Sequence, residues 1–375
     1  MKILISGGAG FIGSRLANAL VQRGHEVTVL DSLSVQVHGN NPESSPLYCY
    51  LCSDIKFIYG DVRNKEDWLR AIDDNQVIVH LAAETGTGQS MYEVERYVDT
   101  NVRGTAVLLN ILANKEKCVR RVVVASSRSI YGEGKYISGA GVVYPSARDE
   151  RDLLNGNFEC KCPITGEGVK LLATDEGSLI QPSSIYGITK YNQEQMVIAM
   201  GKACGFSAIA FRYQNVYGPG QSLKNPYTGI LSIFSTQFLQ GNDVNIFEDG
   251  KESRDFVYVD DVVDATIKGI EIESNDCNVY NVGSGVPTDV LSIANILKKS
   301  YEANGNIVVT GNFRLGDIRH NYADLTKIKS ELGFVPRINF SNGIAEFVKW
   351  VKTQDVVESG YLISLNEMRS RGFFK

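Results

Sequence analysis

A glycine-rich turn close to the start of the chain constrains its fold more than any other feature of the sequence. The turn runs from Gly7 to Gly13 with the letters GGAGFIG, after an apolar run at 2–6 and before an amphipathic stretch at 14–23. Glycines at this spacing allow a tight strand-to-helix turn and let the backbone approach a pyrophosphate at the helix N-terminus. The turn therefore predicts a dinucleotide site, whose residues are Gly7, Gly10, Phe11, Ile12 and Gly13.

The acidic residue that ends the second apolar run indicates which dinucleotide binds. This run spans 26–31, and Asp31 is its last residue. A carboxylate at this point hydrogen-bonds the adenosine ribose and repels a 2′-phosphate, which favours NAD over NADP. Taken separately, the glycines could form an ordinary turn and Asp31 could cap a helix. Their order and spacing together predict NAD as the cofactor.

Short β-branched runs alternate with amphipathic stretches through the first half of the chain. Besides 2–6 and 26–31, strands are predicted at 55–59, 76–81 and 121–125. This βαβ alternation predicts an α/β fold with a doubly wound parallel sheet of the Rossmann type and helices on both faces.

Two long stretches interrupt this alternation, one near 32–53 and one near 133–182. Both follow the carboxyl ends of predicted strands, where doubly wound sheets bind their ligands. After residue 215 the pattern changes to mixed strands and helices. We therefore expect an NAD-binding domain at 1–215 and a smaller mixed α/β lobe at 216–375. This lobe should bind mainly the substrate, and some of its segments should return to the first domain.

Further residues at the ends of predicted strands fit the same cofactor pocket. A carboxylate after the third strand can meet the adenine amino group, and small residues after the fourth strand leave room for the dinucleotide. An asparagine on a following helix can stabilise neighbouring backbone. Individually such residues are more often structural, so their order carries the argument. The additional cofactor residues predicted are Asp61, Val62, Leu81, Ala82, Ala83, Asn101 and Ser126.

A tyrosine and a lysine lie four residues apart on a predicted helix, and hence on one face of it. They are Tyr186 and Lys190. A phenol titrates near pH 10, and an adjacent ammonium, helped by a nicotinamide cation, favours the phenolate. Ser127, at the end of the preceding strand, can hold the substrate hydroxyl and share its proton. Alternatively, Tyr186 and Lys190 could be an exposed pair on a helix without a catalytic role, and Ser127 could belong to a turn at the end of a strand.

Several motifs occur in one order along the chain. They are the GxxGxxG turn, Asp31, Asp61, HLAA at 80–83, Ser127, YxxxK at 186–190 and RYQNVYG at 212–218. This series resembles the extended short-chain dehydrogenases/reductases, and within them the nucleotide-sugar epimerases similar to UDP-galactose 4-epimerase. The resemblance extends to about residue 350, apart from the two interruptions. It implies that Ser127, Tyr186 and Lys190 are catalytic, that Tyr186 and Lys190 also contact NAD, and that the protein is a homodimer.

The resemblance continues in the second half of the chain. The segments RDFVYVDD at 254–261 and RLGD at 314–317 resemble the family segments whose arginines bind the substrate diphosphate. Guanidinium groups suit a diphosphate because they donate two parallel hydrogen bonds. Without the other motifs, Arg254 would be interpreted as a member of a surface ion pair. The predicted partner is a nucleotide-diphosphate sugar, with Thr85, Ser127, Asn215, Arg254 and Arg314 as substrate-binding residues.

The residues after Ser127 bear on the reaction. Related 4,6-dehydratases carry an Asp-Glu pair there and decarboxylases a glutamate, whereas 126–132 reads SSRSIYG. Deprotonation of a ring carbon would need a further acid–base pair, and of the histidines only His80 and His320 could approach the cleft. We therefore expect reversible oxidation at the sugar C4.

The finer resemblance concerns the substrate. The segments at 84–90 and 127–134 resemble those of a subgroup that acts on dTDP-L-rhamnose. A UDP-hexose is the alternative substrate. The alternatives are a nucleotide-sugar 4-reductase or 4,6-dehydratase, and, in another class, a non-catalytic NAD-binding sensor or scaffold. Such a sensor would usually lack the tyrosine or the lysine.

Composition excludes other classes of partner. The formal net charge of −5 gives no positive field for nucleic acid. We expect no membrane span and no signal peptide, and hence a cytoplasmic location.

Seven cysteines are too few for a disulfide scaffold. The pairs Cys49/Cys52 and Cys160/Cys162 could together bind zinc, but we predict no metal, because C-x-C departs from the usual spacing.

Overall fold

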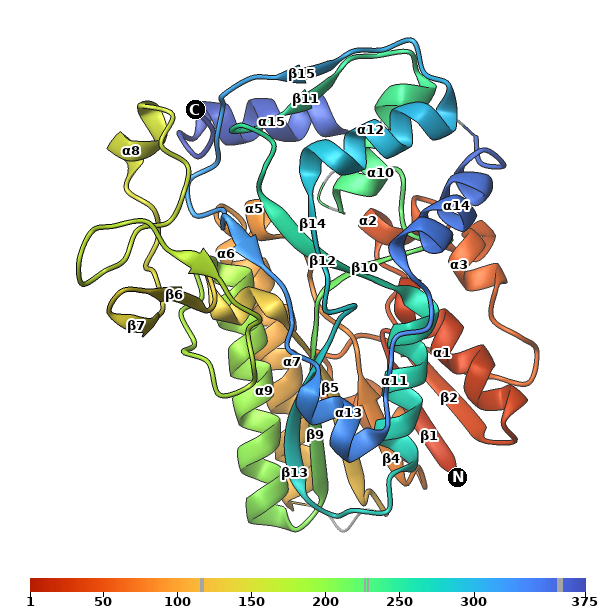
Figure 1. The fold of residues 1–375 in the computed structure, drawn as a ribbon. Helices are drawn as coiled ribbons and strands as arrows, with labels where there is room; N and C mark the ends of the chain where they lie inside the picture. The colour runs from red at the N-terminus through yellow and green to blue at the C-terminus, as the bar shows by residue number, and fades with distance from the viewer. Residues whose placement is uncertain (115–117, 226, 228, 356–359) are drawn as a thin grey trace.

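The computed structural model describes residues 1–114, 118–225, 227, 229–355 and 360–375. Its central layer is a seven-stranded sheet in the order β13-β9-β5-β4-β1-β2-β3, all parallel (Figure 1). The strands are β1 (Lys2–Ser6), β2 (Glu26–Asp31), β3 (Lys56–Tyr59), β4 (Val77–His80), β5 (Arg121–Ser127), β9 (Ser207–Tyr213) and β13 (Cys277–Val282). The parallel sheet predicted from the sequence is therefore confirmed.

Helices cover both faces of this sheet because successive strand side chains point to opposite sides. In β1, Ile3 and Ile5 pack on the side of α1 and α11, whereas Leu4 packs on the other side. The helices are α1 (Phe11–Gln22) and α11 (Val259–Glu271) on one face and α4 (Lys65–Ile72), α7 (Gly104–Asn114) and α9 (Ile185–Cys204) on the other. Strand β13 and helix α11 come from the second half of the chain and complete this layer.

Two element boundaries differ from the prediction in ways that matter for the site. Helix α1 begins at Phe11 instead of residue 14, because Gly10 is already its N-cap. Strand β5 continues to Ser127 instead of residue 125, because Ser126 and Ser127 still pair with β9. Ser126 and Ser127 are thus held by backbone pairing at the carboxyl end of β5.

Both interruptions of the βαβ pattern contain regular structure. The first holds α2 (Val35–His38), η1 (Pro42–Ser44) and α3 (Pro46–Cys49). The second, which we call the excursion (residues 133–182), holds β6 (Tyr136–Ser138), β7 (Gly141–Val143), α8 (Glu150–Leu154) and β8 (Lys170–Leu171). Its strands form a small antiparallel sheet, which lies to one side of the central layer (Figure 1).

Most elements from β10 onward form a second layer above the carboxyl ends of the central strands (Figure 1). They are β10 (Asn215–Tyr217), α10 (Ile230–Leu239), β11 (Val244–Ile246), β12 (Ser253–Tyr258), β14 (Pro287–Asp289), α12 (Val290–Tyr301), β15 (Ile307–Val309), β16 (His320–Asn321), α14 (Phe340–Val351) and α15 (Tyr361–Ser370), whereas α13 (Thr326–Leu332) lies lower, beside α11. Most of them enclose a separate apolar core, while α13 packs back toward β13 and α11. No helix in the described part of the chain is both long and apolar enough to cross a membrane.

Candidate active site

The glycine turn between β1 and α1 is packed too tightly for larger residues. Gly7 has a φ of +72°, and a Cβ there would lie 2.7 Å from the backbone nitrogen of Ala82. A Cβ on Gly13 would lie 2.3 Å from the carbonyl oxygen of Gly7. The turn therefore presents bare backbone at the N-terminus of α1, where Gly10, Phe11 and Ile12 follow. Such a cradle fits a pyrophosphate.

Asp31 ends β2 beside this turn. Its carboxylate accepts hydrogen bonds from the backbone N–H groups of Ala9 at 3.0 Å and Leu33 at 2.9 Å. Burial raises the pKa of Asp31, although these N–H groups act in the opposite direction. The side chain thus stabilises the turn from the position where a ribose partner is expected, and the cradle and carboxylate together fit NAD.

The charge of Asp31 can be tested apart from its hydrogen bonds. We expect Asp31→Asn to keep NAD binding within about tenfold while losing discrimination against NADP, because the amide keeps an acceptor but not the repulsive charge. Asp31→Ala should weaken NAD binding by about 10–100-fold. Titration calorimetry with both dinucleotides measures this, with the exposed Asp54→Ala as the control. Equal affinity of the unmodified protein for NAD and NADP would contradict the assignment.

The other predicted cofactor residues take several roles. Asn101 lies in a π-helical turn, η2 (Val98–Arg103), where it is fully buried. Its side chain bonds the backbone N–H and C=O of Glu84 and the hydroxyl of Thr189, which fixes the segment after β4. Ser126 instead donates to the buried carboxylate of Glu194 at 2.6 Å, so its hydroxyl is directed to α9.

The remaining cofactor candidates lie after β3 and β4. The Asp61 carboxylate is paired with Arg63 at 2.6 Å, and Val62 is buried in the core beneath α7. The half-buried Leu81, Ala82 and Ala83 follow β4, and Ala82 contacts the glycine turn. The structure thus brings this segment, the turn and Asp31 together at one edge of the sheet.

Ser127 and Tyr186 meet at the carboxyl end of β5. Tyr186 lies in the first turn of α9, which begins where the hydroxyl of Ser184 accepts from the backbone N–H of Gly187 at 3.1 Å. Burial raises the pKa of Tyr186, whereas a hydrogen bond with Ser127 and the positive charge of Arg128 act to lower it. The phenol therefore has a hydroxyl and a cation beside it, which suits a base that works as phenolate.

Lys190, four residues after Tyr186 on α9, bonds a neighbour on the same helix. Its Nζ donates to Gln193 Oε1 at 2.7 Å, and the side chain is buried. Burial lowers the pKa of Lys190 to about 7, against the opposing charge of Glu194. The positive charge of Arg128 also acts to lower the pKa of the phenol. Sequence reasoning placed both residues on one helix face but could not see this competition.

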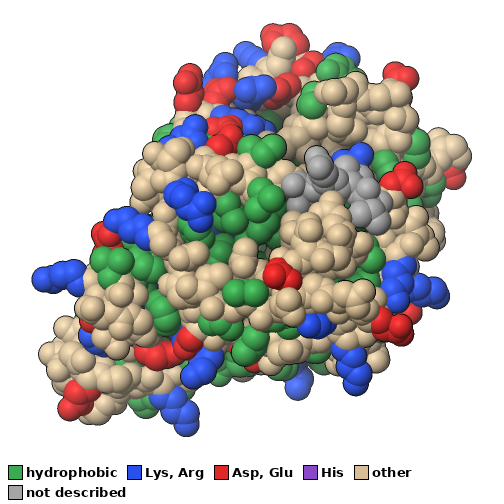
Figure 2. Space-filling view, turned by 90° about the horizontal axis from the view of Figure 1, so that it is seen from above, with side chains coloured by type: hydrophobic (Ala, Val, Ile, Leu, Met, Phe, Trp, Pro, Cys, Tyr) green, Lys and Arg blue, Asp and Glu red, His purple; other side chains and the backbone are tan. Residues whose placement is uncertain are grey.

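A cavity adjoins this pair. It lies between α5 (Thr87–Ser90), η3 (Arg128–Tyr131), the start of α9, the segment 314–318, and the end of the chain from α15 onward. Its lining residues are Thr87, Gly88, Met91, Arg128, Ser129, Ser183, Ser184, Arg314, Leu315, Gly316, Asp317, Ile318, Met368 and Phe373. Seen from above the second layer, the surface is hollowed, with hydrophobic side chains gathered beside basic ones (Figure 2).

The two predicted diphosphate arginines occupy different places. Arg314 lines the cavity, its guanidinium lies 4.8 Å from the Phe247 ring centre, and its buried Nε has no hydrogen-bond partner within the described residues. Arg254 is buried behind the lining and donates to the carbonyls of Ile318 and Arg319. Arg314 is therefore free to bind an anion, whereas Arg254 holds the segment that carries it.

The other two substrate candidates also separate. Asn215 opens β10 and accepts from Nε of Arg128 at 2.9 Å. Thr85 has an exposed side chain and does not line the cavity; its carbonyl accepts from the hydroxyl of Tyr97 at 2.7 Å. Thr87 and Gly88, slightly further along, line the cavity instead.

Of the residues that line the cavity, Arg314 alone was predicted as a site residue, and Arg128, Asp317, Met368 and Phe373 are among those that sequence reasoning missed. The signal for Arg128 was present, because this residue follows Ser127 directly in the run SSRSIYG. Burial alone would raise the pKa of Asp317, but Arg254 and Arg314 outweigh it and lower that pKa. Met368 and Phe373 lie beyond the part of the chain in which motifs could be recognised.

Neither histidine expected near the cleft lines the cavity. His80 is fully buried between the hydroxyls of Ser6 and Thr105. Burial, with the charge of Lys190, lowers the pKa of His80 to about 3, so it stays neutral. His320 bonds the hydroxyl of Ser253 at 2.9 Å and the carboxylate of Glu159 at 3.2 Å. Among the described residues that line the cavity there is no histidine and no cysteine.

The two cysteine pairs lie in different parts of the fold. Cys52 packs against the core beneath α1, whereas Cys160 and Cys162 are buried with Tyr136 in the excursion. Within the described ranges no group of three or more potential metal ligands occurs. The four thiols therefore do not converge on one zinc site.

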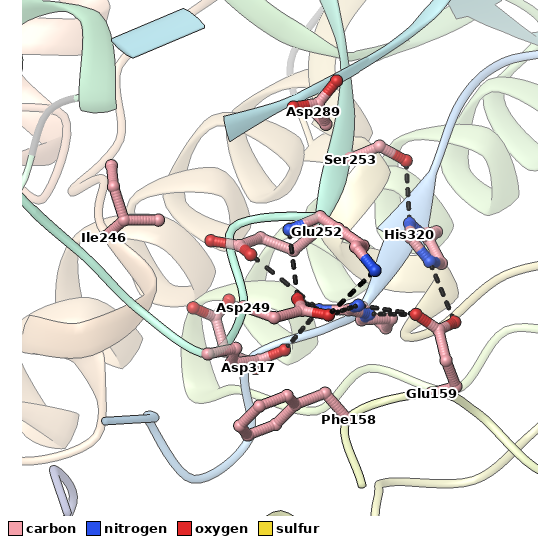
Figure 3. A network of polar contacts seen from close by, with 12 residues as sticks. Phe158, Glu159, Ile246, Asp249, Glu252, Ser253, Asp289, Asp317 and His320 are labelled. Atoms are coloured by element: carbon pink, nitrogen blue, oxygen red, sulfur yellow. Dashed lines mark hydrogen bonds and ion pairs between the residues drawn. The ribbon is translucent and has the colours of Figure 1, made fainter. Parts of the chain in front are cut away.

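A buried ionic cluster ties the excursion to the second layer, next to the cavity. Arg319 is fully buried and bonds Glu159 of the excursion together with Glu248 and Asp249. Figure 3 shows Glu159 and Asp249 within this network, with His320 bonded to Glu159. Arg148 of the excursion bonds Glu248 at 2.7 Å and the carbonyl of Asp317 at 2.9 Å. The cluster therefore fixes the cavity segment 314–318 from behind.

Known proteins resemble this chain along most of its length. The sequence profile described as the NAD dependent epimerase/dehydratase family matches residues 3–148 and 164–283, and its gap falls inside the excursion. The dTDP-L-rhamnose 4-epimerase of Burkholderia thailandensis is 36% identical over 354 residues, which cover 93% of this chain and 94% of that protein.

Two solved structures share the fold. The UDP-glucose 4-epimerase of Thermotoga maritima, with UDP-glucose, has a TM-score of 0.76 at 30% identity, covering 94% of this chain and 99% of its own. The UDP-glucuronic acid 4-epimerase of Bacillus cereus, in complex with UDP-glucuronic acid and NAD, has a TM-score of 0.76 at 26% identity, with the same coverage.

Proposed function

Because this chain belongs to the NAD-dependent epimerase/dehydratase family, we propose that it is a nucleotide-sugar 4-epimerase. The substrate is a dTDP-6-deoxyhexose or a UDP-hexose, and dTDP-L-rhamnose is the first candidate. One observation carries the proposal: the pair Ser127 and Tyr186 adjoins a cavity lined by Arg128 and Arg314. A base beside a cationic cavity suits a sugar joined to a diphosphate. The similarity to a protein named dTDP-L-rhamnose 4-epimerase supports the order of candidates.

The chemistry assigned to this chain is proton transfer at one oxygen. Tyr186, as phenolate, takes the proton of the C4 hydroxyl, and Ser127 holds that oxygen and shares the proton. When bound in the glycine cradle beside Asp31, NAD supplies a hydride acceptor that also returns the hydride. After the 4-keto sugar turns about its diphosphate link, Tyr186 gives its proton back to the C4 oxygen. Arg314 keeps the diphosphate bound during that turn.

The alternative functions differ from the proposed one in the residues or in the cofactor chemistry that they require. A 4,6-dehydratase needs carboxylic acid–base groups after the catalytic hydroxyl, whereas η3 carries Arg128 and Ser129 there. A 4-reductase would consume NADH and release its product in reduced form. A sensor or scaffold has no use for a phenol next to a serine and a cation. We propose in addition a homodimer, and a division of function between lobes near residue 215.

Isotope labelling tests the reaction type. A substrate carrying deuterium at C4 should yield a C4 epimer that keeps the label at C4, and product formed in heavy water should carry no solvent deuterium on carbon. Nuclear magnetic resonance of dTDP-L-rhamnose and then UDP-galactose reads both. Solvent label at C3 or C5 would mean ring-carbon deprotonation, and label recovered in free NADH would mean a reductase or dehydrogenase. Either result would overturn the proposed function.

A further inference from the structure

Arg128 extends into the cavity directly after the serine that bonds the base. It begins η3, and its Nε donates to Asn215 Oδ1 at 2.9 Å. This bond joins the end of β5 to the start of β10 and fixes the plane of the guanidinium. Within the described part of the chain its two terminal nitrogens have no acceptor. Their N–H donors are therefore available to a ligand in the cavity.

The carboxylates nearby do not neutralise this arginine. Asp317 is the closest acidic side chain of the cavity lining, and it pairs with Arg254 at 3.5 Å. Glu133 is occupied by Arg148 at 3.3 Å. Burial, followed by the charge of Arg254, lowers the pKa of Arg128 to about 10, so it stays charged at neutral pH. The cavity thus contains more positive than negative charge at this point.

The surroundings of the Tyr186 phenol single out the same residue. Ser127 faces it from β5 and Arg128 from η3, while the ring of Tyr97 from α6 (Val94–Tyr97) lies edge-on at 6.5 Å. Lys190, on the same helix as the phenol, is bonded to Gln193. The positive charge of Arg128 favours the phenolate form of Tyr186.

We propose that Arg128 is a catalytic residue, which binds oxygen atoms on the sugar side of the substrate diphosphate and holds Tyr186 as the phenolate base. The inference rests on the proposed function for its substrate. One guanidinium can serve both tasks because Arg128 lines the cavity together with Asp317 and Arg314, and because η3 packs on the first turn of α9, where a Cβ on Gly187 would lie 2.6 Å from the carbonyl oxygen of Ser129. Arg314 binds the diphosphate from the far side, so the two arginines hold the substrate at both ends.

Three variants of the NAD-loaded enzyme test the proposal. Arg128→Gln keeps a planar polar group without charge, Arg128→Lys keeps the charge without the fork, and Arg151→Gln alters an exposed arginine on α8 as the matched control. Initial rates of dTDP-L-rhamnose epimerisation are measured from about pH 6 to about pH 10. Bound NAD is quantified in each variant.

Arg128→Gln should reduce kcat/KM at neutral pH by about 10–100-fold, with NAD content unchanged. Because the reaction starts from the phenolate, activity rises as the pH passes the phenol pKa. Loss of the cation raises that pKa, so this limb of the profile should move up by about one pH unit. Arg128→Lys should restore the position of the limb but not KM. A lower kcat with an unmoved pH profile and an unchanged KM would show a packing role only and would overturn the proposal.

The phenol can also be titrated without any substrate. Ultraviolet difference spectra of the NAD-loaded enzyme against Tyr186→Phe isolate the ionisation of this one tyrosine. Its pKa should rise by about one unit in Arg128→Gln and stay unchanged in Arg151→Gln. If the unmodified protein turns over none of the sugar nucleotides, the proposed function fails, yet this titration still decides the role of Arg128. An identical phenol pKa in both variants refutes the electrostatic role.

Discussion

Replacing Tyr186 by phenylalanine is expected to lower kcat by about 10²–10⁴-fold, the usual contribution of a positioned proton-transfer group. The ring itself should keep its place, because its edge-on contact with Tyr97 does not need the hydroxyl. NAD should therefore stay bound, since the cradle at Gly7 and Gly13 is untouched. Steady-state rates and the NAD content of the purified variant measure the two expectations separately.

The matched control lies on the same helix. Tyr191 is half-buried on α9 and belongs to no part of the proposed site, so Tyr191→Phe should keep the rate of the unmodified enzyme. Activity of Tyr186→Phe within about threefold of that rate would remove the phenol from the mechanism. Loss of NAD together with the rate would instead indicate that the substitution disturbs the cofactor site.

Removal of Arg319 should destabilise the protein by about 3–5 kcal/mol. The guanidinium is fully buried, and its loss would leave the buried Glu248 with Arg148 as its remaining arginine and would remove the arginine partner of Asp249. Glu159 of the excursion would lose the same partner. Urea unfolding of Arg319→Ala, followed by circular dichroism, measures the free energy. Arg151→Ala, whose side chain is exposed, should change it by less than about 0.5 kcal/mol.

The same cluster predicts how stability depends on pH. A hydrogen bond from His320, together with Arg319, lowers the pKa of Glu159 to about 2. A carboxylate whose pKa is depressed in the folded state stabilises the protein above its unfolded pKa of about 4 and loses that contribution as the pH falls toward 2. Acid unfolding of Arg319→Ala should therefore begin at a higher pH than that of the unmodified protein. An unchanged acid transition and a loss below about 1 kcal/mol would contradict the role of the cluster.

Strands β1 to β5 of the central sheet could be predicted because each is a short apolar run in the βαβ alternation, whereas β9 and β13 were not predicted. The runs at 2–6 and 26–31 alternate with helical stretches, and a βαβ unit has essentially one way to fold. The glycine turn, Asp31 and Tyr186 could be placed for the same reason, since each has a fixed position relative to a strand end or a helix start. The ends of α1 and β5 could not, because they depend on a cap and on pairing with β9.

The environment of the phenol depends on contacts that the sequence does not announce. Arg128 is oriented by Asn215, 87 residues further along the chain. Lys190 is buried and bonded to Gln193, a pairing that helix periodicity allows but does not demand. The excursion could be recognised as a loop, yet its attachment through Arg148 and Arg319 joins residues far apart in sequence.

The strand order of the central sheet has a consequence for synthesis on the ribosome. The edge of β9 stays unpaired until β13 emerges, because the elements from β10 to α11 are translated in between. At about 5–20 residues per second this leaves an open strand edge for several seconds. Such an edge can pair with another nascent chain. We therefore expect early cessation of translation within the second layer to yield fragments that associate instead of folding, and chaperones to matter most for this interval.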